Sequence, residues 1–345
     1  MKNDKKLSEL GEFGLISRIA SGVSSSGSVI TGIGDDAAVT VSTPGMQLVT
    51  STDMLLEDVH FRRCWHDPYR LGRKSLAVSI SDIAAMGAHP RWALLSLAIP
   101  ADLPLTFLDD FTSGFLAMAA EHGVALIGGD TCSSRSGLAI SVTIMGEQFP
   151  NYILRRSGAK PGDEIWTTGS LGDAALGLKL LEVDSDFPGS EGQVGCGDKV
   201  NQYLCSRLLD PSPRVLVGLA LAESGLVSSM IDISDGILAD FGHIAEQSGV
   251  GGCLRLDDLP FSPAFRLIGD KLPLFPYQLS LTGGEDYELC FTASPESRGE
   301  IAECTKKCGV EATPVGIVTS FPEISVVRSD GTSYGLQTKG FNHFT

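Results

Sequence analysis

Segments typical of strands and of helices alternate from one end of this sequence to the other, which is the pattern of a mixed α/β protein. Residues 47–52 are typical of a strand, and residues 105–122 of a helix that leads into a second strand over 124–127. The Asp-Pro pair at 67–68 predicts another helix start, and Gly87 predicts its end. We therefore expect an α/β (mixed α+β) fold.

The character of the sequence changes over residues 151–162, which are basic and rich in turn-forming residues. Stretches of this kind mark boundaries between domains. A new strand is predicted over 164–168, and a helix is predicted to begin near Asp173. A length of 345 residues suits two domains of ordinary size. We expect one domain over 1–150 and a second over 151–345.

The composition excludes several classes of protein. A formal net charge of −16 argues against nucleic acid as a partner, because its phosphates would be repelled. The longest apolar run, Trp92 to Ile99, is too short to cross a membrane, and the charged residues 1–10 do not resemble a secretory signal. We expect a cytoplasmic protein that binds no membrane. Its eight cysteines form no CxxC pair, so we expect reduced thiols rather than disulfides.

The familiar phosphate-binding loops are absent from this chain. It has no GxxxxGK[ST] loop, no GxGxxG at the start of a helix, and no HRD and DFG pair. If the protein binds nucleotide phosphates, it must do so largely through metal ions. Magnesium is the natural candidate, because it prefers hard oxygen ligands such as carboxylates and phosphates.

Several aspartates follow a glycine turn or come where a strand is expected to end. Asp53 ends the strand predicted over 47–52, and Asp130 follows the strand predicted over 124–127. Gly-Asp is one of the commonest turn pairs, so each site taken alone fits an ordinary turn or cap better than a metal ligand. The full set of these aspartates is Asp35, Asp36, Asp53, Asp130, Asp232 and Asp235.

Asp82 is different, because its helix places it among apolar residues. It shares a helical stripe with Leu71, Ser75 and Val78, at spacings of eleven, seven and four residues. An ionised carboxylate on a buried face is costly unless it is paired or binds a metal. A structural ion pair and a metal ligand are equally good interpretations here.

Two further sites stay open when they are interpreted alone. His60 has apolar neighbours, which favours a hydrogen-bonded core histidine over a binding residue. Arg155 and Arg156 fit either a phosphate-binding fork or a solvated surface pair.

Eight motifs that follow one another in order give these residues a context. They are GIGDD (32–36), STDMLLEDVHF (51–61), SISDIAAMGA (79–88), IGGDT (127–131), RSGAKPGD (156–163), IDISDG (231–236), TGGEDYEL (282–289) and KGFNHF (339–344). This string resembles the thiamine-monophosphate kinase family, in the superfamily of aminoimidazole ribonucleotide synthetase and selenophosphate synthetase. The resemblance covers nearly the whole chain, and eight ordered motifs are far more specific than any one of them.

The resemblance implies a two-domain α/β fold with an N-terminal domain for ATP, metal and dimerisation. It implies a homodimer in which the N-terminal sheets of two subunits join into a shared barrel. It further implies that the γ-phosphoryl group of ATP passes directly and in line to thiamine monophosphate, with Mg²⁺ bridging the phosphates. We therefore expect no side chain to act as a catalytic acid, base or nucleophile, and the transfer to depend on metal ions and positioning.

The resemblance also assigns residues by their place in the motifs. The metal ligands it implies are Asp36, Ser51, Thr52, Asp53, Asp82, Asp130, Asp232 and Asp235. The ATP contacts it implies are Gly129, Asp130, Arg156 and Ser234. The contacts to thiamine monophosphate that it implies are His60, Glu285 and Phe341.

Other members of the superfamily fit less well. Selenophosphate synthetase would carry a reactive cysteine near its N-terminus, whereas the first cysteine here is Cys64. A hydrogenase maturation protein of this fold would end in a cysteine tail, which this sequence does not have. Aminoimidazole ribonucleotide synthetase, the nearest enzymatic alternative, lacks the pattern of Glu285 to Tyr287 and Phe341. An alternative of another class is a nucleotide-binding dimer without catalysis, and the intact set of carboxylates argues against it.

Overall fold

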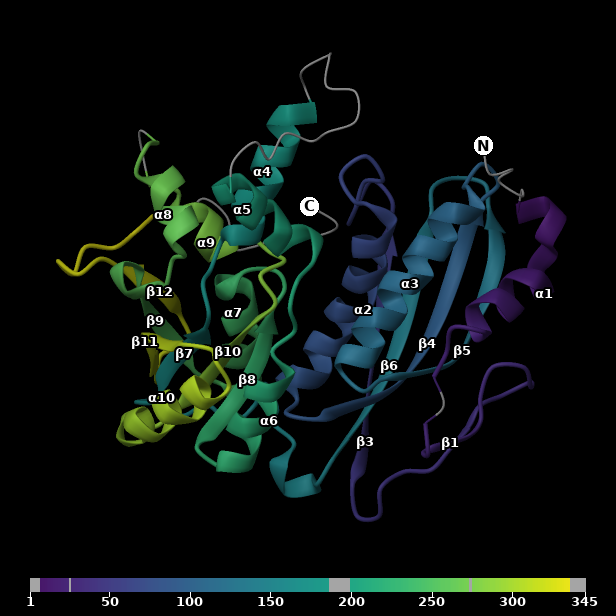
Figure 1. Cartoon of the computed structure of the whole chain (residues 1–345). Coiled ribbons are helices and arrows are strands. Elements are labelled where there is room, and N and C mark those ends of the chain that lie inside the picture. Colours follow the sequence, from purple (N-terminus) through teal and green to yellow (C-terminus); the bar gives the residue numbers. More distant parts are fainter. Residues whose placement is uncertain (1–6, 25, 186–198, 273–274, 336–345) are drawn as a thin grey trace. The chain divides into compact units, whose positions relative to one another are not determined.

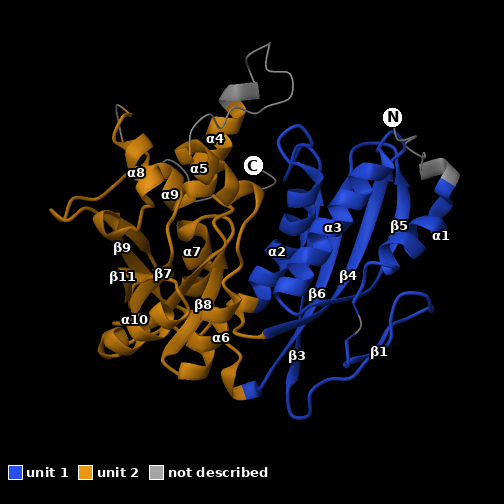
Figure 2. Ribbon diagram, in the orientation of Figure 1, with its two compact units in different colours: residues 1–83, 89–150 blue, residues 84–88, 151–345 orange. Residues whose placement is uncertain are grey.

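The structure, a computed structural model, describes residues 7–24, 26–185, 199–272 and 275–335. The chain divides into two compact units, shown in different colours in Figure 2. The first unit is Met1–Ile83 with His89–Pro150, and the second is Ala84–Ala88 with Asn151–Thr345. Each of them combines helices with one main sheet (Figure 1).

The first unit is built on a four-stranded sheet with the order β3-β6-β4-β5. Figure 1 shows two of its helices, α2 and α3, lying over one face of this sheet. Its strands are β1 (Val29–Thr31), β2 (Val39–Thr40), β3 (Gln47–Leu56), β4 (His89–Pro100), β5 (Ala125–Ser134) and β6 (Ala139–Gln148). Its helices are α1 (Leu7–Ala20), α2 (Pro68–Ala85, whose last residues belong to the second unit) and α3 (Leu105–Glu121).

The two faces of this sheet differ in burial. Alternate side chains of β6, such as Val142 and Ile144, are fully buried on the face under the helices. On β3, the side chains of the other face are exposed, and Leu48 and Met54 keep 54% and 60% of their surface. We call the exposed side of β3 its outward face.

The second unit has a six-stranded sheet with the order β12-β9-β11-β7-β10-β8. Its strands are β7 (Glu164–Thr168), β8 (Val227–Ile233), β9 (Gly251–Arg255), β10 (Glu288–Ala293), β11 (Ala312–Thr319) and β12 (Ile324–Val327). Its α-helices are α4 (Asp173–Ser185), α5 (Lys199–Leu209), α6 (Val215–Ser224), α7 (Ile237–Ser248), α8 (Pro263–Gly269), α9 (Tyr277–Thr282) and α10 (Arg298–Lys307).

Two neighbouring residues of β7 belong to hydrophobic cores on opposite faces of this sheet. Ile165 packs in a core with residues of α7 such as Phe241. Trp166, the next residue, packs in a second core with residues of α6 and α10, and its ring stacks on Phe291 with centroids 5.9 Å apart. The sheet is therefore covered by helices on both faces, which explains why β7 is buried along its whole length.

Two predicted strand ends are wrong. We expected Asp53 to end its strand, but β3 continues to Leu56 because its pairing with β6 continues as far as Ala139. We expected Asp130 to follow its strand, but β5 continues to Ser134 because it pairs with β4 throughout. Both aspartates therefore lie inside strands, where the direction of the side chain is fixed by the pleat.

No helix in the described part of the chain is long and apolar enough to cross a membrane. Every cysteine among the described residues is free.

Candidate functional site

In the first unit, two carboxylates and two hydroxyl groups meet between β3 and α2. Ser51 and Asp53 are alternate residues of β3, so both side chains point to the face that α2 covers. The Ser51 hydroxyl donates a hydrogen bond to the Asp82 carboxylate. The Ser79 hydroxyl donates to the Asp53 carboxylate at 2.6 Å. We call these four side chains the β3–α2 cluster.

The electrostatics of this cluster suit a divalent cation. Burial, together with the negative charge of Asp82, raises the pKa of Asp53 to about 6, and the hydrogen bond from the Ser79 hydroxyl opposes this rise. Neighbouring carboxylates repel each other, and a cation that lies between them removes this repulsion. The atoms that could bind a metal ion here are all hard oxygens, the kind of ligand that magnesium prefers. Within the described ranges, no group of three His, Cys, Asp or Glu side chains lies close enough to hold a metal ion.

Thr52 is not part of this cluster. Because side chains alternate along a strand, that of Thr52 lies on the outward face of β3, where its hydroxyl is 3.2 Å from that of Thr143. The role of Thr52 as a metal ligand stays a prediction.

Asp130 also lies apart from the β3–α2 cluster. The sheet register places Asp130 beside Ser96 of β4, which in turn pairs with Ser141 of β6 and then with Met54 of the outward face. Paired residues of neighbouring strands point to the same side of a sheet. Asp130 therefore shares the outward side with Met54. Its carboxylate accepts a hydrogen bond from the Thr131 amide at 2.9 Å.

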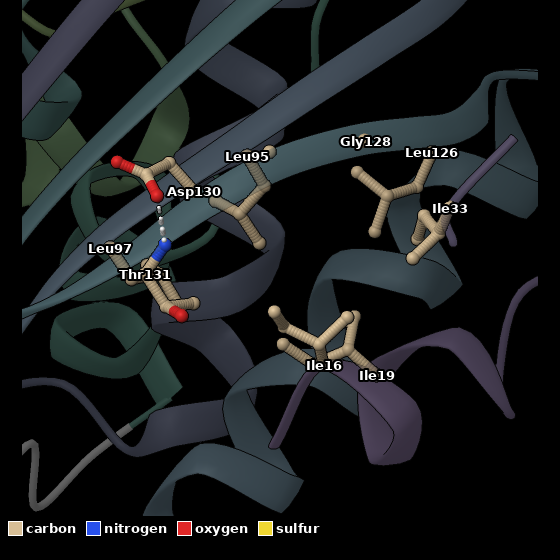
Figure 3. A pocket seen from close by; sticks show the side chains of 10 residues that line it. Ile16, Ile19, Ile33, Leu95, Leu97, Leu126, Gly128, Asp130 and Thr131 are labelled. Atoms are coloured by element: carbon tan, nitrogen blue, oxygen red, sulfur yellow. Dashed lines mark hydrogen bonds between the residues drawn. The ribbon is translucent and has the colours of Figure 1, made fainter. Parts of the chain in front are cut away.

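A mostly apolar pocket adjoins Gly129 and Asp130 (Figure 3). Figure 3 shows the side chains that line it, with Asp130 and Thr131 as its polar members. The other lining residues are Ile16, Ile19, Ile33, Leu95, Leu97, Leu126, Gly128 and Gly129. A side chain at Gly129 would place its Cβ 1.8 Å from the carbonyl oxygen of Leu95. Only glycine therefore lets β5 and β4 pair so closely here.

Two further predicted residues of the first unit lie in loops. Asp36 is exposed, and its backbone amide donates to the carboxylate of Asp35 at 2.8 Å. His60 follows β3, and its Nδ1 accepts a hydrogen bond from the backbone amide of Leu56 at 3.0 Å. Since Nδ1 accepts, the proton of the neutral imidazole must be on Nε2. His60 therefore presents a donor at Nε2.

In the second unit, a set of aspartates surrounds the end of β8 and the start of α7. Asp232 is a buried residue of β8, and Asp240 is a buried residue in the first turn of α7. The Asp240 carboxylate accepts a hydrogen bond from the Asp235 amide at 3.1 Å. Burial and the charge of Asp232 hold the pKa of Asp240 well above its ordinary value.

Glu285 lies directly beside this turn. Its backbone amide donates a hydrogen bond to the carbonyl oxygen of Ser234 at 2.8 Å. The amide of Tyr287 donates to the carbonyl oxygen of Ile233, also at 2.8 Å. Glu285 and Tyr287 both have left-handed backbone conformations, with φ of 71° and 49°. The structure thus brings together residues that the motifs assign to ATP and to thiamine monophosphate.

Gly236 makes this approach of two segments feasible. Its φ is 104°, and a Cβ there would lie 2.9 Å from the Cα of Thr282 and 2.8 Å from its carbonyl carbon. We expect Gly236→Ala to separate the two segments, to lower the free energy of unfolding by about 1–3 kcal/mol and to lower turnover. Chemical denaturation and initial rates measure both effects. Gly225→Ala is the matched control, because Gly225 is also left-handed but has open space around it. Equal loss of activity in both variants would contradict this prediction.

Arg156 and Phe341 are the remaining residues of the predicted set. Arg156 is exposed. Its backbone lies beside the middle of β8 and not beside the end that leads to Ser234, because the carbonyl of Arg155 accepts a hydrogen bond from the amide of Met230. Phe341 lies outside the described residues.

Some residues of the site were missed by sequence reasoning. Ser79 is inside a motif, but nothing in its spacing indicates that it contacts Asp53. Asp240 could have been found from the sequence. It is an acidic residue in the first turn of a predicted helix, where a negative charge is favourable, and it lies only five positions beyond Asp235.

Comparisons with known proteins identify relatives along almost the whole chain. Residues 34–148 match the family model for the N-terminal domain of AIR synthase related protein, and residues 160–328 match the model for its C-terminal domain. The thiamine-monophosphate kinase of Escherichia coli strain K12 is 40% identical to this chain, over 97% of this chain and 98% of its own length.

Solved structures give the same result. The crystal structure of thiamine-monophosphate kinase from Stenotrophomonas maltophilia K279a superposes with a TM-score of 0.81 at 37% identity, and covers 94% of this chain and 98% of its own. A structure described as AaThiL complexed with AMPPCP and TMP superposes with a TM-score of 0.75 at 31% identity, and covers 99% of this chain and 100% of its own.

Proposed function

The chain belongs to the thiamine-monophosphate kinase family of AIR synthase-related proteins, and from this premise we propose how its residues carry out the reaction. It is a thiamine-phosphate kinase, which phosphorylates thiamine monophosphate with ATP. The observation that carries this conclusion is 40% identity to such a kinase over 97% of the chain. The relative described as complexed with AMPPCP and TMP supports binding of both substrates by this chain.

Magnesium ions are the proposed cofactor, held in the first unit by Ser51, Asp53 and Asp82. Two carboxylates and a hydroxyl group fit a divalent cation, and after burial the negative charge of Asp82 is the next largest cause of the raised pKa of Asp53. In the second unit, Asp232 and Asp235 are the proposed ligands. Asp36, Thr52 and Asp130 complete the predicted set. When bound, the ions neutralise the phosphate oxygens of two polyanions that would otherwise repel each other.

The transfer is proposed to be direct. The acceptor is a phosphate oxygen that is already ionised at neutral pH, so no general base is needed. This oxygen forms a bond to the γ-phosphorus of ATP while the bond from that phosphorus to the bridging oxygen breaks, and ADP leaves with the electron pair. Since Nδ1 of His60 is engaged by the Leu56 amide, Nε2 is a hydrogen-bond donor in the neutral ring, which suits phosphate binding rather than attack.

Substrate contacts follow the motifs and the positions described above. Gly129, Asp130, Arg156 and Ser234 are the proposed contacts for ATP. His60, Glu285 and Phe341 are the proposed contacts for thiamine monophosphate. The hydrogen bond between the Glu285 amide and the Ser234 carbonyl supports this assignment, because it places a residue of each set side by side.

A homodimer in the cytoplasm is the proposed assembly, with the N-terminal sheets of two copies joined in a barrel. Exposed apolar side chains on or next to the strands of the first unit support it, since apolar surface of this kind is commonly covered by a partner. These side chains are Ile30, Val39, Val41, Leu48 and Met54.

Incubation with ATP, magnesium and thiamine monophosphate, followed by chromatography, should yield thiamine diphosphate and ADP. Run with ATP that is chiral at the γ-phosphorus, the same reaction should invert the configuration, because a single in-line displacement inverts it once. Retention would indicate a phosphoenzyme and contradict direct transfer. Binding of ATP without turnover of thiamine monophosphate would instead favour a nucleotide-binding dimer without catalysis.

A further inference from the structure

The guanidinium group of Arg207 contacts both neighbours of Tyr287, which lies two residues beyond the proposed acceptor contact Glu285. Arg207 lies near the end of α5 and is largely buried, with 12% of its side chain exposed. Its Nη2 donates to the backbone carbonyl oxygen of Asp286 at 3.1 Å and to Oε1 of Glu288 at 2.8 Å. These two acceptors flank Tyr287. One side chain from a distant helix therefore contacts the backbone just before Tyr287 and the carboxylate just after it.

This part of the backbone needs such a restraint. Glu285 and Tyr287 are left-handed without being glycine, which costs on the order of 1 kcal/mol or more at each residue. Backbone of this kind relaxes unless its surroundings hold it. The side chain of Asp286 provides a second restraint on this segment, because its buried carboxyl group accepts a hydrogen bond from the Gly172 amide at 2.7 Å.

Arg214 offers a natural comparison, because it shares only one of the two partners of Arg207. Its Nε donates to Oε2 of Glu288 at 2.7 Å, and its Nη2 donates to Oε1 of the same carboxylate. Burial alone would raise the pKa of Glu288, but Arg214 and Arg207 hold it below its ordinary value. Since two arginines contact Glu288, removal of either one leaves this buried carboxylate with a cation.

We propose that Arg207 is a positioning residue for thiamine monophosphate. Its guanidinium holds the segment from Glu285 to Tyr287 in the conformation that aims Glu285 at the acceptor. This inference rests on the proposed contact between Glu285 and thiamine monophosphate. Arg214 neutralises the same carboxylate but makes no hydrogen bond to the Asp286 carbonyl, so it supports the fold without positioning Glu285.

The test compares Arg207→Met and Arg207→Lys with the matched variant Arg214→Met. KM for thiamine monophosphate, KM for ATP, kcat and the free energy of unfolding are measured for each. Arg207→Met should raise KM for thiamine monophosphate about tenfold or more and change KM for ATP much less, because a small misplacement of a binding group has a large effect. Arg207→Lys should restore part of the loss, since an ammonium retains one donor. Arg214→Met should destabilise the protein to a similar degree with little change in either KM.

A double-mutant cycle with Glu285→Ala separates this inference from the proposed function. If Arg207 acts through Glu285, the double variant should be little worse than Glu285→Ala alone. Additive effects, or equal increases in KM from Arg207→Met and Arg214→Met, would overturn the inference and leave the contact of Glu285 standing. An unchanged KM for thiamine monophosphate in Glu285→Ala would overturn both. Should Arg207→Met fail to fold, the comparison of Arg207→Lys with Arg214→Lys decides by the same readouts.

Discussion

Replacing Asp53 by Asn should lower turnover by about 100-fold or more while the fold stays intact. The amide retains an oxygen that can accept from Ser79, so the local packing is kept. The substitution removes one of the two carboxylates of the β3–α2 cluster, both proposed magnesium ligands, and charge neutralisation is the main task in phosphoryl transfer. Chelation of magnesium in the unaltered protein should have the same effect. Steady-state rates with saturating substrates measure both.

The same substitution should raise the stability of the metal-free protein slightly. Burial and the charge of Asp82 oppose the ionised form of Asp53, so removing its charge relieves an unfavourable interaction. Asp110→Asn is the matched control, because it makes the same change of charge at an exposed position of α3 in the same unit. Turnover near the normal rate in Asp53→Asn would refute the role of the β3–α2 cluster in metal binding.

Asp286 should make the protein less stable as the pH rises from about 4 to about 8. Burial raises the pKa of Asp286 to about 8, whereas an unfolded chain ionises this group near 3.8. Between these values the folded state binds a proton that the unfolded state has lost, so the free energy of unfolding falls with pH. The contribution is about 1.4 kcal/mol for each unit by which the pKa is raised, which amounts to several kcal/mol in total.

Urea unfolding of Asp286→Asn and of the unaltered protein, at pH 5 and at pH 8, should reveal this contribution. The amide is neutral at both values, so the stability of the variant relative to the unaltered protein should increase from pH 5 to pH 8. Its carbonyl oxygen can still accept from the Gly172 amide. Asp110→Asn should show no such trend, because that residue is exposed. A stability difference that is the same at both pH values would mean that Asp286 is ionised in the folded protein.

Much of the fold could be predicted from local patterns. The mixed α/β two-domain fold of AIR synthase-related proteins is confirmed, and so are helices such as α2, which begins at the predicted Pro68. The strand ends at Asp53 and Asp130 could not be predicted, because they depend on how far β6 and β4 continue the pairing. Propensity and turn residues carry no information about the length of a distant partner strand.

In the candidate site too, features that depend on local spacing could be predicted and long-range contacts could not. The stripe that contains Asp82 correctly indicates a partly buried carboxylate, since it follows from the spacing within one helix. Its partner, the Ser51 hydroxyl, lies 31 residues away and could not be inferred from spacing. The contacts of Arg207 cross about 80 residues, and a lone arginine at the end of a helix gives no local signal for them. Long-range polar contacts of this kind need the folded chain.

The outward face of β3 has a consequence for how this enzyme must be handled. Leu48 and Met54 lie exposed there, and a second copy that covers them, as proposed, would bind the folded chain but not the unfolded one. By mass action, the melting temperature would then rise with total enzyme concentration. A dilute kinetic assay and a concentrated calorimetry sample would contain different proportions of monomer, so rates and stabilities are comparable only at one matched concentration.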